Sequence, residues 1–465
     1  MKSLYKRPPT PEQLAIISEP RDGVKIIRGA AGSGKTTTAL LMLRQLSRFW
    51  VSRKTRLHIA GCVRALVLTY NRTLKGYIAD LAQGEAQSEP GLELCVSTFA
   101  KFTRDIYDTY QVLDVERSQR EIKRLSQHIP LPGDFVVDEV DYLLGRFLPD
   151  DLAAYLDCKR DGRGSAPRVD KDLRRKLLDE VVSPYSNWKD STGVVDWNDL
   201  ALLLAQEPQD VQYDIIIVDE TQDMSANQIR AIMNCAAKPS SVVFVMDAAQ
   251  RIYPRGFTWK EVGILNPKTY TLRQNHRNTA QICALASPLL DGMSIGDDGA
   301  LPDLKSCSRS GPVPLVLKGK YNKQIAYVLE YIKSYIDLSK ESVAFLKPHG
   351  GQWFDCLKAA LEREALPYVE ITRAGEWPTG TENIALSTMH SAKGLEFDHV
   401  FILGLNDETT PHGEEPGDSA LENLRRILAV AITRARELVI IGYKPENASR
   451  LIGLLKAGTF REITL

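Results

Sequence analysis

The sequence predicts an α/β fold made of two domains, each built around a parallel sheet. Short apolar runs bounded by turn residues recur along the chain with helical stretches between them, which is typical of buried parallel strands covered by helices. The runs form two groups. The first lies at residues 24–28, 65–69, 214–218 and 241–245, and the second at residues 342–346, 384–387, 399–403 and 437–441.

Length and composition agree with this prediction. A chain of 465 residues suits two or three domains. Hydrophobic residues make up 43% and charged residues 25%, which excludes the disordered and fibrous classes. Lys plus Arg and Asp plus Glu both number 59, so the net charge is zero and gives no sign of a polyanionic partner. Evidence for such a partner must come from local patterns.

The cysteines and the apolar segments exclude two further classes. The seven Cys residues are scattered, without the close pairs that hold zinc or form a redox motif. No segment approaches the roughly 18 apolar residues of a membrane span. We therefore expect free thiols, no membrane association and a cytoplasmic location.

Between the first two and the next two apolar runs, residues 103–198 are helical in pattern and rich in charge. This indicates a helical insertion in the first sheet domain. The expected division is residues 1–102 plus 199–278 for the first domain, 103–198 for the insertion and 279–465 for the second domain.

A phosphate-binding loop follows the first apolar run. The pattern of Gly, four residues and Gly-Lys-Ser/Thr, flanked by a strand and a helix, is specific for nucleoside triphosphates. Lys35 is expected to neutralise the β and γ phosphates of ATP, and Thr36 to hold Mg²⁺. Backbone N–H groups and the helix dipole favour the phosphates. The nucleotide-binding residues expected here are Gly29, Ala30, Ala31, Gly32, Ser33, Gly34, Lys35, Thr36 and Thr37.

The apolar run at residues 214–218 ends in Asp219 and Glu220. An acidic pair after a strand is a weak signal alone, but it becomes strong beside a phosphate loop. Asp219 is expected to order the Mg²⁺ shell together with Thr36. Glu220 is expected to polarise the attacking water.

With the run Asp219-Glu-Thr-Gln222-Asp in view, the chain resembles the superfamily 1A helicases of the UvrD, Rep and PcrA type. The resemblance implies two RecA-like domains with ATP between them, and an enzyme that hydrolyses ATP with Mg²⁺. It places Gln13 of the run Thr-Pro-Glu-Gln at the adenine and Gln222 in the nucleotide site. Two motifs after the phosphate loop are similar to those that contact the nucleic acid strand. Their residues are Thr69, Tyr70, Asn71 and Phe99.

The remaining motifs follow in the family's order. Residues 245–253 resemble the motif in which Gln250 senses the γ-phosphate and Tyr253 meets a base. Arg277, in the run Gln-Asn-His-Arg, is implied to contact the γ-phosphate, as is Arg434, the arginine finger. In the run at 388–397, His390 is implied to approach the strand and Glu396 the ribose. The catalytic set is then Lys35, Asp219, Glu220, Gln250, Arg277 and Arg434.

Three departures from the family pattern bear on function. His276 stands where the family has a Tyr that stacks on adenine, so base selectivity is expected to be looser. The Trp that normally follows Tyr253 is missing, and Phe257 or Trp259 is its candidate substitute at the strand. The second accessory insertion does not fit between Arg277 and His390, so we expect good translocation and weak unwinding.

A local basic run gives independent support for a nucleic acid partner. Residues 39–79 contain no Asp or Glu but eight Lys or Arg residues interleaved with aromatic residues. Cations and aromatic faces together suit a single strand, although a basic solvent face is an equally good reading of the run alone.

The leading hypothesis is an ATP-driven translocase or helicase that moves 3′ to 5′ on single-stranded DNA or a 3′-tailed duplex, with RNA left open. Its polarity is inferred only from the resemblance. The alternative is a nucleic-acid sensor or motor subunit that serves a separate nuclease, as in small UvrD-like components of anti-phage systems such as Gabija. A catalytically dead scaffold is disfavoured because the residues expected to turn over ATP are intact.

Overall fold

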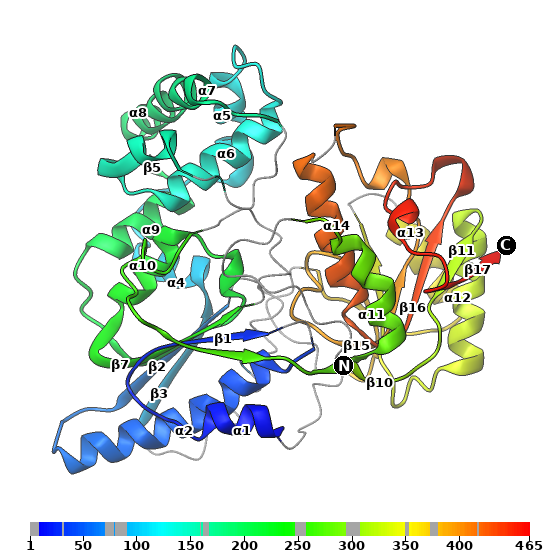
Figure 1. Ribbon diagram of the computed structural model, residues 1–465, viewed down its shortest axis with the longest axis horizontal. Coiled ribbons are helices and arrows are strands. Elements are labelled where there is room, and N and C mark those ends of the chain that lie inside the picture. Colours follow the sequence, from blue (N-terminus) through cyan, green and yellow to red (C-terminus); the bar gives the residue numbers. More distant parts are fainter. Residues whose placement is uncertain are drawn as a thin grey trace.

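The computed structural model describes residues 9–29, 32–69, 79, 91–158, 160, 167–246, 257–293, 307–348, 353–372, 380–415 and 418–465. Ala30, Ala31, Tyr70, Asn71, Gln250 and Tyr253, all singled out above, lie outside these residues. Two parallel-sheet domains stand side by side, and a group of helices rises from the first (Figure 1). The predicted α/β class is confirmed, and each of the eight apolar runs forms a strand.

The first domain contains a six-stranded sheet in the order β3-β2-β6-β7-β1-β8, with every pair parallel. Its strands are β1 (Gly23–Gly29), β2 (Val63–Thr69), β3 (Leu92–Thr98), β6 (Tyr213–Val218), β7 (Ala236–Met246) and β8 (Lys268–Leu272). Its helices are α1 (Pro11–Ile17), α2 (Lys35–Arg56), α4 (Phe99–Ile106), α9 (Trp197–Gln206) and α10 (Ala226–Asn234).

Alternating side chains of these strands fill two cores. Ile27 and Ile217 pack toward α1 and α2, while Ile26 and Ile216 pack toward α4, α9 and α10. A parallel sheet covered on both faces needs apolar residues at every position. This is why its strands read as continuous apolar runs.

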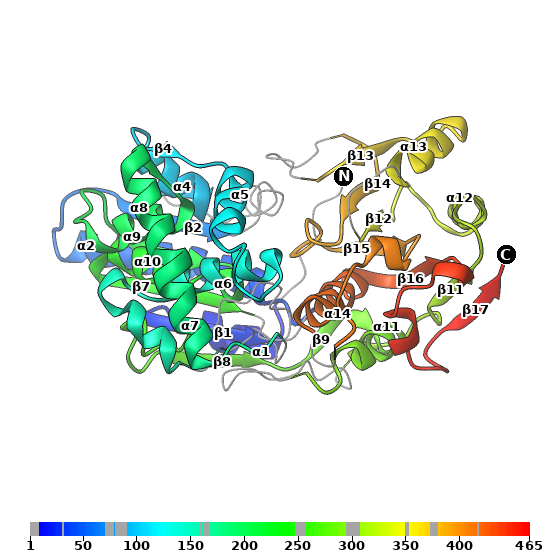
Figure 2. The same ribbon diagram turned by 90° about the horizontal axis from the view of Figure 1, so that it is seen from above.

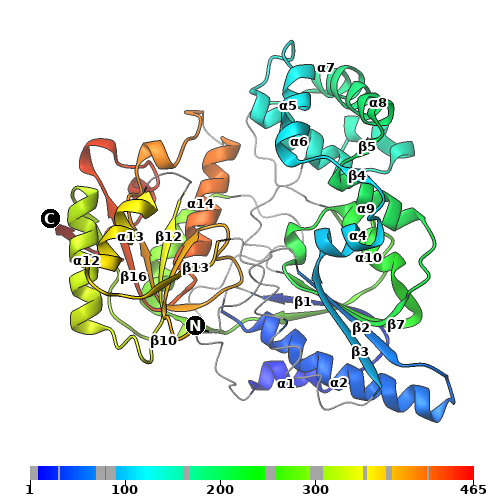
Figure 3. The same cartoon turned by 180° about the vertical axis from the view of Figure 1, so that it is seen from behind.

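The helical insertion has its own core and stands above α9 and α10, on the side of the sheet away from α2 (Figure 3). Buried ion pairs, such as that of Lys189 with Asp196, also hold it together. Its main elements are β4 (Gln111–Val112), α5 (Val115–Leu125), α6 (Gly133–Arg146), η1 (Pro149–Leu156), α7 (Lys171–Lys176), η2 (Leu177–Val182), α8 (Ser183–Thr192) and β5 (Val194–Val195).

The second domain contains a seven-stranded parallel sheet in the order β13-β14-β12-β15-β16-β11-β17. Its strands are β11 (Leu315–Lys318), β12 (Val343–Lys347), β13 (Tyr368–Glu370), β14 (Ile384–Thr388), β15 (Phe397–Ile402), β16 (Ala435–Tyr443) and β17 (Arg461–Thr464). Its helices are α11 (Ala280–Ala286), α12 (Tyr321–Tyr335), α13 (Trp353–Arg363) and α14 (Ser419–Ile432). Short 3-10 turns are η3 (Thr221–Asp223) in the first domain and η5 (Ser287–Leu290), η7 (Asp407–Thr409), η8 (Pro445–Asn447) and η9 (Ile452–Leu454) in the second.

Seen from above, α11 and α14 lie on the side of the second sheet that faces the first domain, and α12 and α13 cover the far side (Figure 2). A small pair of parallel strands, β9 (Asn275–Thr279) and β10 (Cys307–Arg309), lies outside both large sheets. The chain thus enters the second domain through β9, whose residues bear on the site below.

Candidate nucleotide site between the two domains

The phosphate loop joins β1 to the long helix α2. Gly32 and Gly34 have φ of 77° and 79°, in the left-handed region that favours glycine. A Cβ on Gly32 would also lie 2.2 Å from the side-chain oxygen of Asn275. Helix α2 has no acidic residue in its first turn and no side-chain cap at Gly34. Its N-terminal N–H groups and dipole therefore suit an anion.

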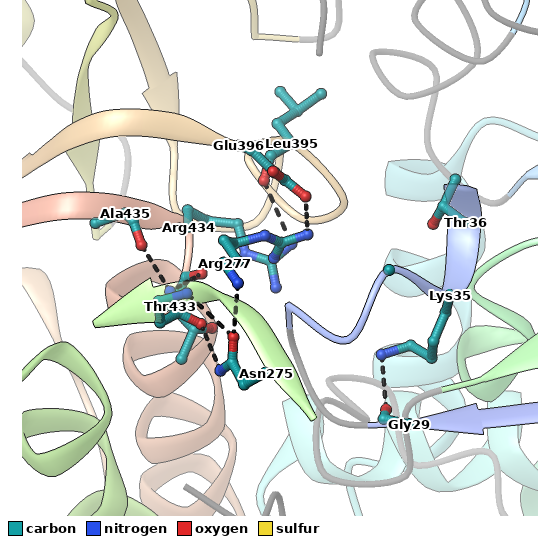
Figure 4. Close-up of polar contacts among 12 residues, drawn as sticks. Gly29, Lys35, Thr36, Asn275, Arg277, Leu395, Glu396, Thr433, Arg434 and Ala435 are labelled. Atoms are coloured by element: carbon teal, nitrogen blue, oxygen red, sulfur yellow. Dashed lines mark hydrogen bonds and ion pairs between the residues drawn. The ribbon is translucent and has the colours of Figure 1, made fainter. Parts of the chain in front are cut away.

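Two side chains at the start of α2 lie where the sequence predicts phosphate and metal chemistry (Figure 4). The Lys35 Nζ donates to the Gly29 carbonyl at 2.7 Å, which holds the ammonium beside the loop. The Thr36 hydroxyl donates to Asp219 Oδ2 at 2.9 Å. Asp219 follows β6 and is 3% exposed. A hydroxyl and a carboxylate oxygen in contact are the hard donors that Mg²⁺ takes beside nucleotide phosphates, so the pair fits the predicted ion.

The two acidic residues differ in their electrostatics. Burial, followed by the adjacent Glu220 carboxylate, raises the pKa of Asp219. Burial also opposes ionisation of Glu220, but Lys393, Arg434 and Lys35 outweigh it and lower the pKa of Glu220. Glu220 is thus held as a carboxylate by cations from both domains, which is the state a base for water requires.

Glu220 also has an uncommon backbone conformation. Its φ of 53° is in the left-handed region, which costs energy for a residue with a side chain. The Glu220 N–H donates to Asp219 Oδ1 at 3.0 Å, and the Gln222 side chain donates to Glu220 Oε2 at 2.5 Å. The strained turn therefore fixes the direction of the carboxylate.

Lys393 brings the second domain to this acidic group. It lies in the crossover from β14 to β15 and is 4% exposed. Its Nζ pairs with Asp223 Oδ2 and lies 3.3 Å from Glu220 Oε2. Both carboxylates belong to the first domain. This buried ion pair therefore joins the two domains at the predicted catalytic base.

Arg277 and Arg434 lie close together, across from Lys35 and Thr36 (Figure 4). Arg277, in β9, pairs through Nη2 with Glu396, and its Nε is buried without a hydrogen-bond partner. Arg434 is 2% exposed, and its Nε donates to the Val430 carbonyl at 3.1 Å. Glu396, predicted at the ribose, is thus the partner of Arg277 in this conformation.

Gln13 and His276 border the phosphate loop from other directions. Gln13 is 6% exposed, and its side chain accepts from Thr10 N at 2.9 Å and donates to the Gly34 carbonyl at 3.3 Å. One amide donor and one lone pair remain for the predicted adenine contact. The His276 N–H donates to the Gly32 carbonyl at 3.0 Å, and its Nε2 is buried without a partner.

Comparison with known proteins agrees with this arrangement. Residues 12–255, more than half of the chain, match the AAA domain family model, and residues 357–446 match that of the UvrD-like helicase C-terminal domain. The chain belongs to the UvrD-like helicases of superfamily 1A.

Several proteins named as DNA helicases are similar to this chain over part of their length. A probable DNA helicase of Mycoplasma pneumoniae is 26% identical over 57% of this chain and 52% of its own length. The ATP-dependent DNA helicase UvrD2 of Mycobacterium tuberculosis is 24% identical over 58% of this chain and 55% of its own. PcrA of Staphylococcus aureus is 51% identical, but over only 13% of this chain and 9% of its own. This chain thus spans about half the length of the first two relatives.

Among solved structures, the C-terminal domain of a possible DNA helicase from Lactobacillus plantarum WCFS1 matches 40% of this chain and 98% of its own. Its sequence identity is 18% and its TM-score 0.30. Within the part of the chain that the structure describes, no helix is long and apolar enough to cross a membrane.

The nucleic acid contacts implied by the UvrD-like motifs remain predictions. Thr69 and Phe99 are 0% and 3% exposed, and Phe99 packs in the core of the first domain. Phe257 is half-buried against Trp259, with ring centroids 5.7 Å apart, and Trp259 is itself a core residue. His390 is exposed. In this conformation His390 is thus the most accessible of these five residues predicted to contact nucleic acid.

The basic run is partly neutralised where the structure describes it. Arg53 pairs with Asp22 at 3.0 Å, and Lys54 pairs with Asp214 at 2.7 Å. Both lie in the last turn of the 22-residue helix α2, roughly 30 Å from the phosphate loop at its first turn. These two cations are therefore engaged in holding α2 to the sheet.

Sequence reasoning missed three residues of this site. Asp223 and Lys393 lie within the motifs at residues 219–223 and 388–397, but their function was not predicted from the sequence. A Lys within a matched motif is nevertheless a sign that an acidic partner lies nearby. Asn278, next to Arg277, is fully buried and bonds across to β16. No local pattern marks such a contact, because its partners are backbone carbonyls.

Proposed function

We propose that the chain hydrolyses ATP in the cleft between its two sheet domains and uses the cycle to move along single-stranded DNA. The observation that carries this proposal is the buried contact of Lys393, from the second domain, with Glu220 and Asp223 of the first. A base held by the opposite domain changes its surroundings whenever the domains move. Hydrolysis and domain motion are then coupled.

Each residue has a distinct part in the proposed reaction. The N–H groups of α2 and Lys35 bind the β and γ phosphates. Thr36 and Asp219 would hold Mg²⁺, which shields phosphate charge and aligns the γ-phosphate when bound. Glu220 orients a water and takes its proton as the water oxygen bonds to the γ-phosphorus and ADP leaves.

The arginines complete the site from the second domain. Arg277 exchanges Glu396 for the γ-phosphate, and Arg434 adds a second positive charge as the phosphoryl group is transferred. Attraction to the γ-phosphate closes the cleft, and its loss after hydrolysis lets the cleft open. One closing and opening would advance the strand by one step.

The names of the relatives support DNA as the strand, since they are a probable DNA helicase and ATP-dependent DNA helicases. The 3′ to 5′ direction rests on the family resemblance. We also propose weak unwinding by the chain alone, because the segment between Arg277 and His390 is too short for a second accessory domain.

Displacement of streptavidin from biotinylated oligonucleotides tests movement and direction together. ATP should speed release from a 5′ biotin and leave release from a 3′ biotin unchanged, because the motor runs toward the 5′ end. Lys35→Ala is the matched control and should show no acceleration. If ATP does not change the rate of streptavidin release from either end, the proposal of a motor is contradicted. ATP binding without movement would favour the alternative of an ATP-switched subunit serving a nuclease.

A further inference from the structure

Asn278 joins the strand that carries one arginine to the backbone around the other. Its Nδ2 donates to the Thr433 carbonyl at 2.9 Å and to the Ala435 carbonyl at 2.6 Å. These two residues flank Arg434. Asn278 has no exposed surface, so both bonds form away from competing water. Figure 4 labels Thr433, Arg434 and Ala435 beside Asn275 and Arg277 of β9.

A second amide fixes Asn278 from the other side. Asn275 Nδ2 donates to Asn278 Oδ1 at 2.9 Å, and Asn275 Oδ1 accepts the N–H groups of Arg277 and Asn278 at 3.0 Å each. Because its oxygen already accepts a hydrogen bond, the Asn278 amide has one orientation, with both donors toward β16. The amide therefore acts as a rigid connector.

The connector also reaches the phosphate loop. The N–H of His276, between Asn275 and Arg277, donates to the Gly32 carbonyl at 3.0 Å. The chain of contacts thus runs from the loop through β9 to Arg434. A displacement of about 1 Å in a group that meets the transferring phosphoryl can cost about 100-fold in rate, so backbone placement of Arg434 matters.

We propose that Asn278 is a positioning residue for ATP hydrolysis, which holds the backbone of Arg434 so that Arg277 and Arg434 reach the γ-phosphate as one unit. This inference rests on the proposed function. It assigns a role to a residue that need not touch ATP, and it explains why one short strand bonds to both the phosphate loop and β16.

The fold itself does not depend on Asn278 alone. Arg309, in β10, donates through Nη1 to the carbonyls of Arg277 at 2.6 Å and Arg436 at 3.2 Å, and pairs with Glu437. Strands β9 and β16 therefore stay linked when the Asn278 bonds are lost. Removing the amide should loosen Arg434 and leave the domain folded.

The first test compares Asn278→Ala with Asn383→Ala. Asn383 is a matched control, since it is 8% exposed and its Nδ2 donates to the Leu338 carbonyl at 2.8 Å in the same domain. Asn278→Ala should lower kcat for ATP about 10- to 100-fold and change KM less than about 3-fold. Asn383→Ala should lower the melting temperature similarly and leave kcat near the wild-type value.

The second test uses Arg434→Ala and the double variant with Asn278→Ala. If Asn278 acts only through Arg434, the double variant should be no slower than Arg434→Ala, whereas independent effects would multiply. Affinity for ADP with aluminium fluoride, which mimics the transferring phosphoryl, should fall in Asn278→Ala while affinity for ADP stays unchanged. If Asn278→Ala is too unstable to purify, Asn278→Ser takes its place.

The outcomes separate the inference from the proposed function. Wild-type hydrolysis with unchanged kcat in Asn278→Ala, or multiplied losses in the double variant, would overturn the inference alone. A wild-type protein that hydrolyses no ATP under any condition would overturn both.

Discussion

Replacing Lys393 with Met removes the ammonium group that joins the domains at Glu220 and Asp223. Lys393 is 4% exposed, and the Glu220 and Asp223 side chains are 12% and 1% exposed. Removing one partner of a buried ion pair costs about 3–5 kcal/mol, because the remaining charge is buried without compensation. Two carboxylates lose the same partner here, so we expect the free energy of unfolding to fall by an amount in the upper half of that range.

The same change should shift the pH dependence of hydrolysis. In the wild type Glu220 has a pKa below its ordinary 4.5, so the stability from this ion pair is present above 4.5 and is lost as pH falls through the lowered pKa. Without Lys393, only Arg434 and Lys35 remain to offset the effect of burial, which opposes the ionisation of Glu220. Each 1.4 kcal/mol of lost interaction raises a pKa by about one unit. We expect the acid limb of kcat against pH to move up by about 1–2 pH units.

The assay is steady-state ATP hydrolysis from pH 4 to 8, with unfolding in urea measured in parallel. Lys189→Met is the matched control, since Lys189 is 3% exposed and pairs with Asp196 of the helical insertion at 2.8 Å and with Asp199 of α9 at 2.6 Å. It should lose similar stability and keep the wild-type acid limb. Lys393→Arg should restore most of the wild-type profile. An unshifted acid limb in a folded Lys393→Met protein would refute the assignment of Glu220 as the base held by Lys393.

Three further predictions concern other parts of the molecule. Glu220→Gln should abolish ATP turnover while ATP still binds, checked by single-turnover hydrolysis and by fluorescent-nucleotide titration; retained turnover would contradict its role. Burial and Arg21 lower the pKa of Lys25 from 10.5 to about 8. The unfolded chain then binds more protons than the folded protein between these pH values. The free energy of unfolding of the wild type, measured in urea relative to that of Lys25→Met, should therefore rise by about 3 kcal/mol from pH 8 to 10.5. A difference between the two proteins that stays constant with pH would contradict this prediction. Arg230 Nη1 and Nη2 donate to the carbonyls of Arg146 and Glu261 at 2.8 Å each, so Arg230→Met should cost about 1–3 kcal/mol and speed hydrogen exchange in α6 but not in α2.

The central strands of both sheets could be predicted from sequence because they are buried on both faces. Ile215–Val218 and Val242–Val245, for example, have almost no polar interruption. The edge strands escaped prediction. β8 exposes alternate positions and contains Lys and Thr, whereas β17 exposes most of its positions and contains Arg, Glu and Thr. Only tertiary pairing distinguishes such segments from loops.

The site shows a similar limit. Spacing placed Lys35, Thr36 and Asp219 together, because the loop and the carboxylate follow strands of one sheet whose ends meet at one edge. The pairing of Lys393 with Glu220 depends on how the two domains pack. The pairing of Arg277 with Glu396 joins segments that lie 119 residues apart in the chain. Motifs in the sequence identify such residues but not their partners, because several opposite charges are possible partners and only the three-dimensional structure determines which one lies in contact.

The most direct test of a two-domain motor is the rate of ATP hydrolysis by the purified chain with and without single-stranded DNA. Single-stranded RNA and blunt duplex DNA serve as comparisons. We predict that single-stranded DNA raises kcat severalfold or more, that blunt duplex does not, and that Arg434→Ala removes most of the stimulated rate. Hydrolysis that no nucleic acid changes, or that survives Arg434→Ala, would contradict a site completed by the second domain and coupled to a strand.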